Sequence, residues 1–268
     1  MPLLEVDKLT FGYDPQDIFK NISFQVKKGE VFFLLGPNGC GKTTLLDCIL
    51  GLLKPKGGDI RLNGKDTKGT RCDHIAKQLA YVPQSHEKTF PYTVLDIVLM
   101  GRASYIGMFG SPSEQDIDFA EEALELVGII HLKDRRYTQL SGGEGQLVMI
   151  ARSLAQKTPL IIMDEPTSHL DFKHEMVILE TIVELVRDTG ISIIMATHFP
   201  NHAFYFENNR VNTRVALMNQ GTFLVSGTPT DVISEENLWW LYNINARVAS
   251  FFINTEQELR QVIPISTK

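Results

Sequence analysis

The chain has 268 residues, of which 43% are hydrophobic and 22% are charged, and its formal net charge is −6. This length suffices for one large domain with a buried core or for two small domains. The acidic balance lacks the basic surplus of non-specific nucleic-acid binders, so we expect no nucleic-acid partner. Three cysteines without a CxxC pair disfavour a disulfide scaffold and a structural zinc site. No window approaches about 20 uninterrupted apolar residues, and the first residues are too polar for a signal peptide, so neither a membrane span nor a leader is expected.

The N-terminal region has the pattern of β-strands. Branched and aromatic residues predict a first strand, and an alternating run that becomes continuously apolar predicts two more about a Lys-Lys-Gly-Glu turn. A glycine-rich loop precedes a predicted helix over about 42–52, and an Asn-Gly turn ends a short exposed strand. The predicted strands fall within 3–11, 22–35, 57–65 and 78–84.

The character changes between about 90 and 158, where the periodicity is helical apart from a glycine-rich loop at 107–113. Strand-like apolar runs then return on both sides of another predicted helix. The whole pattern predicts an α/β fold whose core is interrupted by an all-helical insert. The later predicted elements are strands at 160–166 and 192–198, a helix at about 172–188, a hairpin at 214–227 and weak strand character at 244–257.

The segment "GPNGCGKT", residues 36–43, matches the pattern G-x-x-x-x-G-K-[ST]. It follows a predicted buried strand and precedes a predicted helix, which is the context that a phosphate-binding loop requires. Glycines let backbone N–H groups surround phosphate oxygens. Lys42 would neutralise the β- and γ-phosphates, the Thr43 hydroxyl would bind Mg²⁺, and Thr44 would reach the α-phosphate. A plain strand–turn–helix loop with a surface lysine is the alternative, and the flanking elements disfavour it.

The segment "LIIMDEP", residues 160–166, ends an apolar run with two carboxylates. A strand buried on both faces would deliver Asp164 and Glu165 at its carboxyl edge, where open α/β sheets bind ligands. Asp164 would then hold Mg²⁺ through water, and Glu165 would act as general base toward the attacking water. Taken alone, such a run is as often an ordinary strand end, so the interpretation depends on the phosphate-binding loop.

Three further side chains are candidates with strong alternatives. Gln84 follows a short predicted strand and would contact both Mg²⁺ and the attacking water, although a surface glutamine is more common there. His198 ends an apolar strand and would donate a hydrogen bond to the γ-phosphate, although such a histidine is usually a strand cap. Tyr13 could stack on a purine, although an aromatic residue in that place is more often part of the core.

Residues 140–155, "LSGGEGQLVMIARSLA", look like an amphipathic helix with an uncovered, flexible start. Free N–H groups and the helix dipole make such a start an anion site, yet no lysine lies nearby in the sequence. Ser141 could simply cap its own helix, and both roles are compatible.

The order of these motifs resembles the nucleotide-binding subunit of ABC transporters over nearly the whole chain. The family's Walker A motif corresponds to Gly36–Thr43, its signature to Leu140–Glu144, its Walker B to Leu160–Glu165 and its D-loop to Ser168–Asp171. Gln84 and His198 correspond to the Q-loop and the switch histidine. The resemblance implies a P-loop NTPase core with an N-terminal antiparallel β subdomain and an inserted helical subdomain.

The resemblance also implies ATP and Mg²⁺ as cofactors and a homodimer that sandwiches two ATP molecules. Each signature helix would grip the γ-phosphate bound to the partner's Walker A motif, which explains a helix start without a lysine. Catalytic roles fall to Lys42, Gln84, Glu165 and His198, and Mg²⁺ contacts to Thr43, Gln84 and Asp164. The implied nucleotide contacts are Tyr13, Gly36, Asn38, Gly39, Cys40, Gly41, Lys42, Thr43, Thr44, Gln84, Ser141, Gly142, Gly143, Asp164 and Asp171.

The sequence departs from the family pattern after the signature, where Gly145 replaces the usual basic residue. A third glycine at the helix start costs roughly 1 kcal/mol of helix stability relative to alanine. The substitution also removes a charge near the expected interface, so we expect weaker or more ATP-dependent dimerisation.

Residues 91–102 and 227–244 look like the branch of metal-chelate importers, whose cargo includes siderophore-iron, haem, cobalamin and molybdate or tungstate. That branch implies an integral-membrane permease, an external solute-binding protein and a peripheral location at the cytoplasmic face of the membrane. The permease would dock near residues 88–112, with candidate lining residues Tyr92, Val94, Leu95, Val98 and Met108, for which core packing is an equal alternative.

The expected division is a nucleotide-binding core at 1–87 and 159–245, a helical subdomain at 88–158 and a short tail at 246–268. An ABC exporter subunit and a soluble ABC ATPase outside transport remain alternatives. Both are disfavoured, since the chain has one cassette, a compact insert and no fused membrane span. A P-loop kinase is disfavoured by the signature helix.

Overall fold

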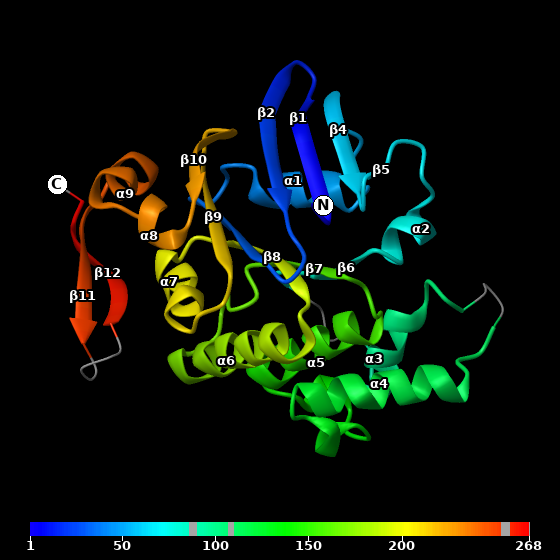
Figure 1. The fold of residues 1–268 in the computed structure, drawn as a ribbon. Coiled ribbons are helices and arrows are strands. Elements are labelled where there is room, and N and C mark those ends of the chain that lie inside the picture. The colour runs from blue at the N-terminus through cyan, green and yellow to red at the C-terminus, as the bar shows by residue number, and fades with distance from the viewer. Residues whose placement is uncertain (86–89, 107–109, 253–257, 268) are drawn as a thin grey trace. The chain divides into compact units, whose positions relative to one another are not determined.

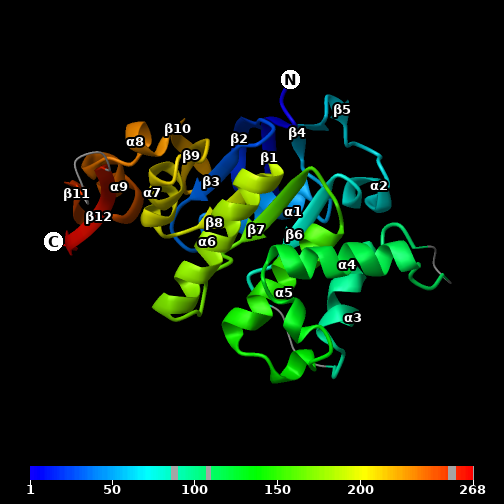
Figure 2. The same ribbon diagram turned by 60° about the horizontal axis from the view of Figure 1, so that its bottom comes forward.

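The computed structural model describes residues 1–85, 90–106, 110–252 and 258–267 (Figures 1 and 2). The chain divides into two compact units. Unit 1 comprises residues 1–69 and 192–268, and unit 2 comprises residues 70–191. The phosphate-binding loop therefore belongs to unit 1, and the segment "LIIMDEP" and the signature helix belong to unit 2.

Unit 1 begins with an antiparallel sheet of order β2-β1-β4-β5. Asn63 and Gly64 both have positive φ between β4 and β5, as the two-residue Asn-Gly turn requires. The predicted turn is thus confirmed, although the strand before it is only partly exposed, because Ile60 and Leu62 are buried. The strands are β1 (Leu4–Tyr13), β2 (Gln16–Val26), β4 (Gly57–Leu62) and β5 (Lys65–Asp66).

The second set of strands in unit 1 has the order β10-β9-β3-β8. β3 is parallel to both β8 and β9, whereas β10 is antiparallel to β9. Every residue of β3 and β8 is buried, in agreement with the continuous apolar runs in the sequence. The strands are β3 (Val31–Leu35), β8 (Ser192–Thr197), β9 (Thr213–Asn219) and β10 (Thr222–Gly227).

Aromatic rings join the two sets of strands in unit 1. The Phe24 ring of β2 stacks on the Phe32 ring of β3, with 4.7 Å between centroids, and lies 5.7 Å from the Phe223 ring of β10. Burial of large aromatic rings is a major stabilising contribution in a core. The strand that leads into the phosphate-binding loop is therefore fixed from both sheets.

Unit 1 also contains helices and a C-terminal hairpin. The elements are α1 (Lys42–Ile49), α7 (Pro200–Asn208), α8 (Pro229–Val232), α9 (Glu235–Tyr242), β11 (Asn245–Phe252) and β12 (Glu258–Ser266). The sequence predicts strand character over β11 but not β12. The Asn201 amide accepts a hydrogen bond from the Val262 N–H (2.7 Å) and donates one to the Val262 carbonyl (3.2 Å). Asn208 contacts both backbone groups of Arg260 in the same way, each at 3.3 Å, so two side chains of α7 hold β12.

Unit 2 contains the parallel pair β6 (Leu79–Val82) and β7 (Leu160–Asp164), with helical elements between them. Among the described residues of 88–158 all the named elements are helical, which confirms the predicted all-helical insert in an α/β fold. The domain boundaries at 87/88, 158/159 and 245/246 stay a prediction. The helices are α2 (Cys72–Ala76), α3 (Val94–Leu99), α4 (Glu114–Leu126), α5 (Gly142–Ala155) and α6 (Phe172–Thr189), with short 3-10 turns η1 (Met100–Arg102), η2 (Ile130–Leu132) and η3 (Tyr137–Gln139).

Helix α5 differs from its predicted amphipathic pattern. Apart from Gly142, Glu144 and Arg152, every residue of the helix is buried. Burial also lowers the pKa of Arg152. The helix therefore lies mostly inside unit 2, and its only exposed residue is Gly142 at its start.

Candidate functional site

The phosphate-binding loop runs from Gly36, directly after β3, to Gly41, the residue before α1. Gly39 and Gly41 have φ angles of +78° and +105°, which side-chain-bearing residues rarely adopt. A Cβ at Gly36 would overlap the Met218 carbonyl oxygen of β9. Backbone conformation or close approach thus favours glycine at all three positions, of which the motif itself fixes Gly36 and Gly41.

Lys42 is 5% exposed and lies at the first position of α1. Its ammonium donates hydrogen bonds to the carbonyl oxygens of Gly36 (2.8 Å) and Pro37 (3.1 Å), so the charge is held within the loop. Thr43 is exposed and Thr44 is half-buried on the following turn. A positive charge beside the N-terminus of α1 and a glycine loop is an environment suited to a polyphosphate.

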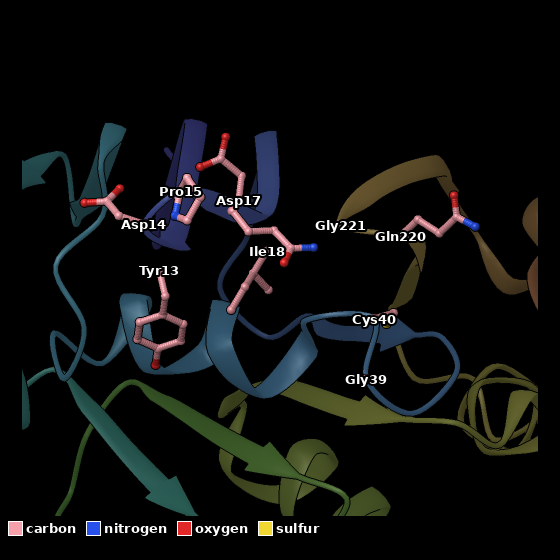
Figure 3. Close-up of a pocket in the computed structure, with 10 residues that line it drawn as sticks. Tyr13, Asp14, Pro15, Asp17, Ile18, Gly39, Cys40, Gln220 and Gly221 are labelled. Carbon is pink, nitrogen blue, oxygen red and sulfur yellow. The ribbon is translucent and has the colours of Figure 1, made fainter.

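A cavity of about 650 Å³ lies beside the loop in unit 1 (Figure 3). Its lining comes from the turn between β1 and β2, from the loop, and from the tip of the β9–β10 hairpin. The volume lies in the range of small-molecule and cofactor sites. The lining residues are Tyr13, Asp14, Pro15, Gln16, Asp17, Ile18, Gly39, Cys40, Gln220 and Gly221.

Tyr13 is 64% exposed and meets the Phe11 ring edge-on, with 5.3 Å between centroids. The alternative of a core aromatic is therefore wrong, and the ring is available to stack on a planar ligand. Lys56 joins Asp14 (2.8 Å) and Asp17 (3.1 Å) in ion pairs at the same turn. The hydrogen bonds of Asp17 to Lys20 and Lys56 lower its pKa.

His198 directly follows β8 and is half-buried. Its backbone carbonyl accepts a hydrogen bond from the Tyr242 hydroxyl at 2.9 Å, and its ring centroid lies 3.9 Å from that of Phe199. The neighbouring Thr197 hydroxyl lies 3.2 Å from Nδ1 of His202. The backbone of His198 is thus fixed at the carboxyl end of a buried strand.

In unit 2, the carboxyl end of β7 presents Asp164 and Glu165, which are 1% and 8% exposed. Glu165 has a φ of +46°, an uncommon conformation for a residue with a side chain and one that is concentrated at functional sites. The Gln84 amide donates a hydrogen bond to Oε2 of Glu165 at 3.2 Å. The structure thereby brings together two predicted site residues that lie 81 positions apart in the sequence.

The start of α5 is exposed but well capped. Oγ of Ser141 accepts a hydrogen bond from the Glu144 N–H (3.2 Å), and Oε2 of Glu144 accepts one from the Ser141 N–H (2.7 Å). The two bonds form a capping box, so the prediction of a loose start is wrong and the alternative that Ser141 caps its own helix is confirmed. A Cβ at Gly143 would overlap the His174 ring of α6.

Asp171 is the N-cap of α6 and accepts hydrogen bonds from the His174 N–H (2.9 Å) and from its Nδ1 (2.8 Å). The backbone hydrogen bond, followed by that of the ring, lowers the pKa of Asp171. The Ser168 hydroxyl lies 3.4 Å from the Gln84 carbonyl oxygen, to which it donates. The segment after Glu165 is therefore tied both to Gln84 and to the start of α5.

The docking segment at 88–112 is only partly as predicted. Val94 and Val98 are fully buried, so their prediction as accessible lining is wrong, whereas Tyr92 is 45% exposed. Leu95 is half-buried, and Met108 lies outside the described residues. A groove of about 420 Å³ is instead lined by Asp96, Leu99, Met100, Ala103, Ile106, Gly110 and Pro112.

The sequence also missed most of the cavity beside Tyr13. Gln16, Ile18 and Gln220 line it but are not part of any predicted motif. The sequence indicates these lining residues only indirectly, through two turns. One turn is marked by Asp14-Pro15, and the other by the Asn-Gln-Gly of the predicted hairpin. Two turns that are distant in the sequence become neighbours only through the fold.

The described part of the chain contains neither a cluster of metal-binding side chains nor a helix that could span a membrane. No group of three or more His, Cys, Asp or Glu side chains there could hold a metal ion. Within the same residues, none of the helices has the length and apolar character needed to cross a membrane.

Comparisons with known proteins agree with this geometry. Residues 19–168 match the family model described as ABC transporter. The chain is 35% identical over 242 residues to the molybdate import ATP-binding protein MolC of Haemophilus influenzae, covering 90% of this chain and 88% of MolC. It is 37% identical over 241 residues to the achromobactin transport ATP-binding protein CbrD of Dickeya dadantii, with the same two shares.

A solved structure of a metal-chelate type ABC transporter in an inward-facing conformation is also similar. Its TM-score is 0.85 at 32% identity, and the match covers 98% of this chain and 97% of that one. Since the family model spans more than half of the sequence and both relatives exceed 30% identity over most of it, the chain belongs to the ABC transporter family, as an ATP-binding protein with ATPase activity.

Proposed function

We propose that this protein is the ATP-hydrolysing subunit of an importer and that two copies enclose two Mg²⁺-ATP molecules. The observation that carries the hydrolytic role is the buried, strained Glu165, which Gln84 holds through a hydrogen bond. ABC transporter ATP-binding proteins work with membrane permease components, and the importer assignment extends this to uptake.

The phosphate-binding loop would receive the nucleotide. Loop N–H groups and the Lys42 ammonium, which already lies against two loop carbonyls, would bind the β- and γ-phosphate oxygens. Tyr13 is exposed at the adjoining cavity and would stack on the adenine ring. The absence of a Cβ at Gly39 and Gly41 lets the backbone approach the phosphates.

The residue types fit a magnesium ion held together with the nucleotide. The Thr43 hydroxyl, the Gln84 side-chain oxygen and the Asp164 carboxylate are the hard oxygen ligands that Mg²⁺ prefers, with waters and phosphates completing the set. When bound, the ion would neutralise charge on the transferring phosphoryl group. Asp164 is 1% exposed, so its charge is shielded from water and needs a cation or donors nearby.

Glu165 would accept a proton from the attacking water, and the Gln84 hydrogen bond would keep the carboxylate oriented for that transfer. His198 would donate a hydrogen bond to the γ-phosphate as charge develops there. Both side chains follow buried strands whose backbones are fixed, which supports a constant geometry for the reaction.

The open start of α5 would contact the γ-phosphate bound to a second copy. Ser141 and Gly142 are exposed, as such a role requires, and Gly142 would meet the ligand through its backbone. Because the capping box uses the Ser141 and Glu144 N–H groups internally, the remaining N–H groups of the first turn would serve the phosphate. ATP would therefore hold the two copies together, and hydrolysis would release them.

A cytoplasmic helix of the permease would occupy the groove on α3 and η1. The groove is apolar at Leu99, Met100, Ala103 and Ile106 and carries one acidic residue, Asp96. An amphipathic helix with a basic residue at its edge matches that pattern. The subunit would then lie at the cytoplasmic face of the membrane, and an external solute-binding protein would act only through the permease.

The cargo would be a metal chelate or a metal oxyanion. The names of MolC and CbrD refer to molybdate and to achromobactin, and the structural neighbour is of the metal-chelate type. We expect the permease and binding protein to select the cargo. Uptake of radiolabelled molybdate and of ferric siderophores into membrane vesicles carrying the co-purified permease would distinguish the oxyanion from the metal chelate as cargo.

The decisive test of the hydrolytic role is Glu165→Gln. We expect ATP to bind as in the wild type, with turnover lowered by about 10²–10⁴-fold because the general base is lost. Equilibrium binding of ATP and release of phosphate are the two measurements. Glu180→Gln, at an exposed position of α6, is the control and should hydrolyse ATP normally. Wild-type turnover by Glu165→Gln would exclude the proposed role.

A further inference from the structure

The short η1 turn packs against the far end of the signature helix α5. A Cβ at Gly101 would overlap the Arg152 carbonyl oxygen of α5, so the two backbones are in direct contact. Only glycine allows this approach, because any side chain would push η1 away from the helix. Gly101 is itself buried.

Arg102, the next residue, makes a second and independent attachment. Its Nε donates a hydrogen bond to Oδ1 of Asp116 at 2.8 Å, and its Nη1 donates one to the Ala155 carbonyl at 3.0 Å. The Arg102 side chain is 7% exposed and that of Asp116 is 12% exposed. Ala155 is the last residue of α5, so a buried guanidinium joins η1, α4 and the C-terminus of the signature helix.

Aromatic rings complete the surroundings of Arg102. The guanidinium carbon lies 4.1 Å from the Tyr105 ring centroid and 4.7 Å from that of Phe119. Hydrogen bonds from Ser113, followed by those from Arg102, lower the pKa of Asp116 to about 2, so the pair is charged at neutral pH. A planar cation with several donors suits this arrangement, and a lysine could not reproduce it.

We propose that Gly101 and Arg102 are positioning residues that connect the permease-docking segment, α3 and η1, to the signature helix. The inference rests on the proposed function, in which Ser141–Gly143 engage ATP bound to a second copy. Helix α5 is 14 residues long, which corresponds to roughly 21 Å at 1.5 Å per residue. A displacement of its start would reach η1 through the Gly101 contact and the Arg102 hydrogen bonds, because both attach to its last turn.

Groove residues Met100 and Ala103 directly flank Gly101 and Arg102. The same turn therefore faces the permease on one side and α5 on the other. Breaking the attachment would require exposing a buried ion pair and vacating a tight backbone contact, which makes η1 and α5 move as one body.

Two backbone amides can report on the two ends of this connection. The Gly145 N–H donates to the Ser141 carbonyl at the start of α5, and the Tyr105 N–H donates to the Arg102 carbonyl beyond η1. Hydrogen exchange at both would be measured on full-length Glu165→Gln protein, with and without Mg²⁺-ATP. In that background we expect ATP to slow exchange at Gly145 and also at Tyr105.

The test variant is Arg102→Met combined with Asp116→Asn, which avoids a buried unpaired charge and keeps a side-chain oxygen at position 116 as an acceptor for Ser113. We expect the ATP-dependent change at Gly145 to persist and the change at Tyr105 to be lost. Arg102→Lys is a second variant, which keeps the charge beside Asp116 but cannot also hold the Ala155 carbonyl and the rings. It should fold normally and show the same loss.

Lys157→Met is the matched control, because it removes an ion pair with Glu122 and a cation over the same Phe119 ring, but at the surface. It should keep both ATP-dependent changes. Persistence of the Tyr105 change in Arg102→Lys, or its absence from the unmodified background while Gly145 responds, would overturn the inference. If Gly145 itself fails to respond to ATP, the proposed engagement of the signature helix is wrong instead.

Discussion

Two glycine-rich helix starts, those of α1 and α5, are built in different ways. At α1, Gly39 and Gly41 adopt backbone conformations with positive φ, which glycine tolerates, and Lys42 supplies the positive charge. At α5 none of Gly142, Gly143 and Gly145 has a positive φ, and the capping box of Ser141 and Glu144 already bonds two N–H groups. Gly143 is needed for space, because the His174 ring occupies the volume of a Cβ.

The difference indicates different tasks. The α1 start has no side-chain cap, because its N-cap residue Gly41 has no side chain. The α5 start is already stabilised by its own side chains, so it needs no ligand in order to be stable. Under the proposed function, α1 would bind ATP in every cycle and α5 would contact it only when two copies meet, and the two constructions fit these two tasks.

The largest effect should come from removing the charge at α1. Lys42→Ala deletes the ammonium that is bound to Gly36 and Pro37, and we expect ATP hydrolysis to fall by about 10²–10³-fold because one preorganised charge is lost from the transferring group. Steady-state phosphate release measures it. Lys54→Ala, on the turn after α1, is the control. A loss of less than about fivefold would contradict the comparison.

The next prediction tests whether position 143 must be glycine because a larger side chain would not fit there. Gly143→Ala should cost about 1–3 kcal/mol of stability through overpacking against His174, measured by thermal or urea unfolding. His174→Ala in the same chain should restore most of that loss, because the ring that meets the new methyl group is gone. If the double variant is no more stable than the single one, conformation rather than space explains the glycine.

Gly41→Ala tests the opposite explanation at α1. An alanine at φ +105° is strained by roughly 1–2 kcal/mol whatever its neighbours are. We expect ATP affinity to fall by about tenfold, since about 1.4 kcal/mol corresponds to a factor of ten. Ile18→Ala, which removes one of the two nearest side chains, should give no rescue when combined with it, and neither should Met218→Ala, which removes the other. Calorimetric ATP binding distinguishes this outcome from the rescue expected at Gly143.

The smallest effect concerns the cap of α5. Ser141→Ala removes one acceptor for the Glu144 N–H and should lower the free energy of unfolding by about 0.5–2 kcal/mol even without ATP. Ser141→Asp should retain this stability but repel a phosphate, so the two variants separate capping from anion binding. An unchanged melting temperature in Ser141→Ala would show that the cap contributes little.

Much of the fold and of the candidate site follows from local sequence patterns. Strands β3, β7 and β8 are continuous apolar runs that end at functional residues, and their burial makes them visible without a structure. The phosphate-binding loop is similarly evident, because its glycines have a fixed conformational purpose. The Gln84–Glu165 hydrogen bond links distant segments, but the order of the motifs anticipates it.

Other features depend on how elements face one another. Val94 and Val98 look like an accessible apolar stripe, yet the capping box of Thr93 and Asp96 begins a helix whose valines point into the core. The amphipathic pattern of α5 conceals a helix that is buried on most sides. Strand β12 contains Pro264 and charged residues, and its partners on α7 lie about 50 or more positions away, so no local signal predicts it.

The two asparagines of α7 have a further consequence for the C-terminal hairpin. A strand at the rim of a sheet offers its N–H and C=O groups to any passing extended chain, which is a common route to fibrillar association. Asn201 and Asn208 each engage both backbone groups of one β12 residue, Val262 and Arg260 respectively, as a neighbouring strand would. Two side-chain amides of α7 thus take the place of a neighbouring strand. By bonding to these backbone groups of β12 they protect this edge of the hairpin against self-association.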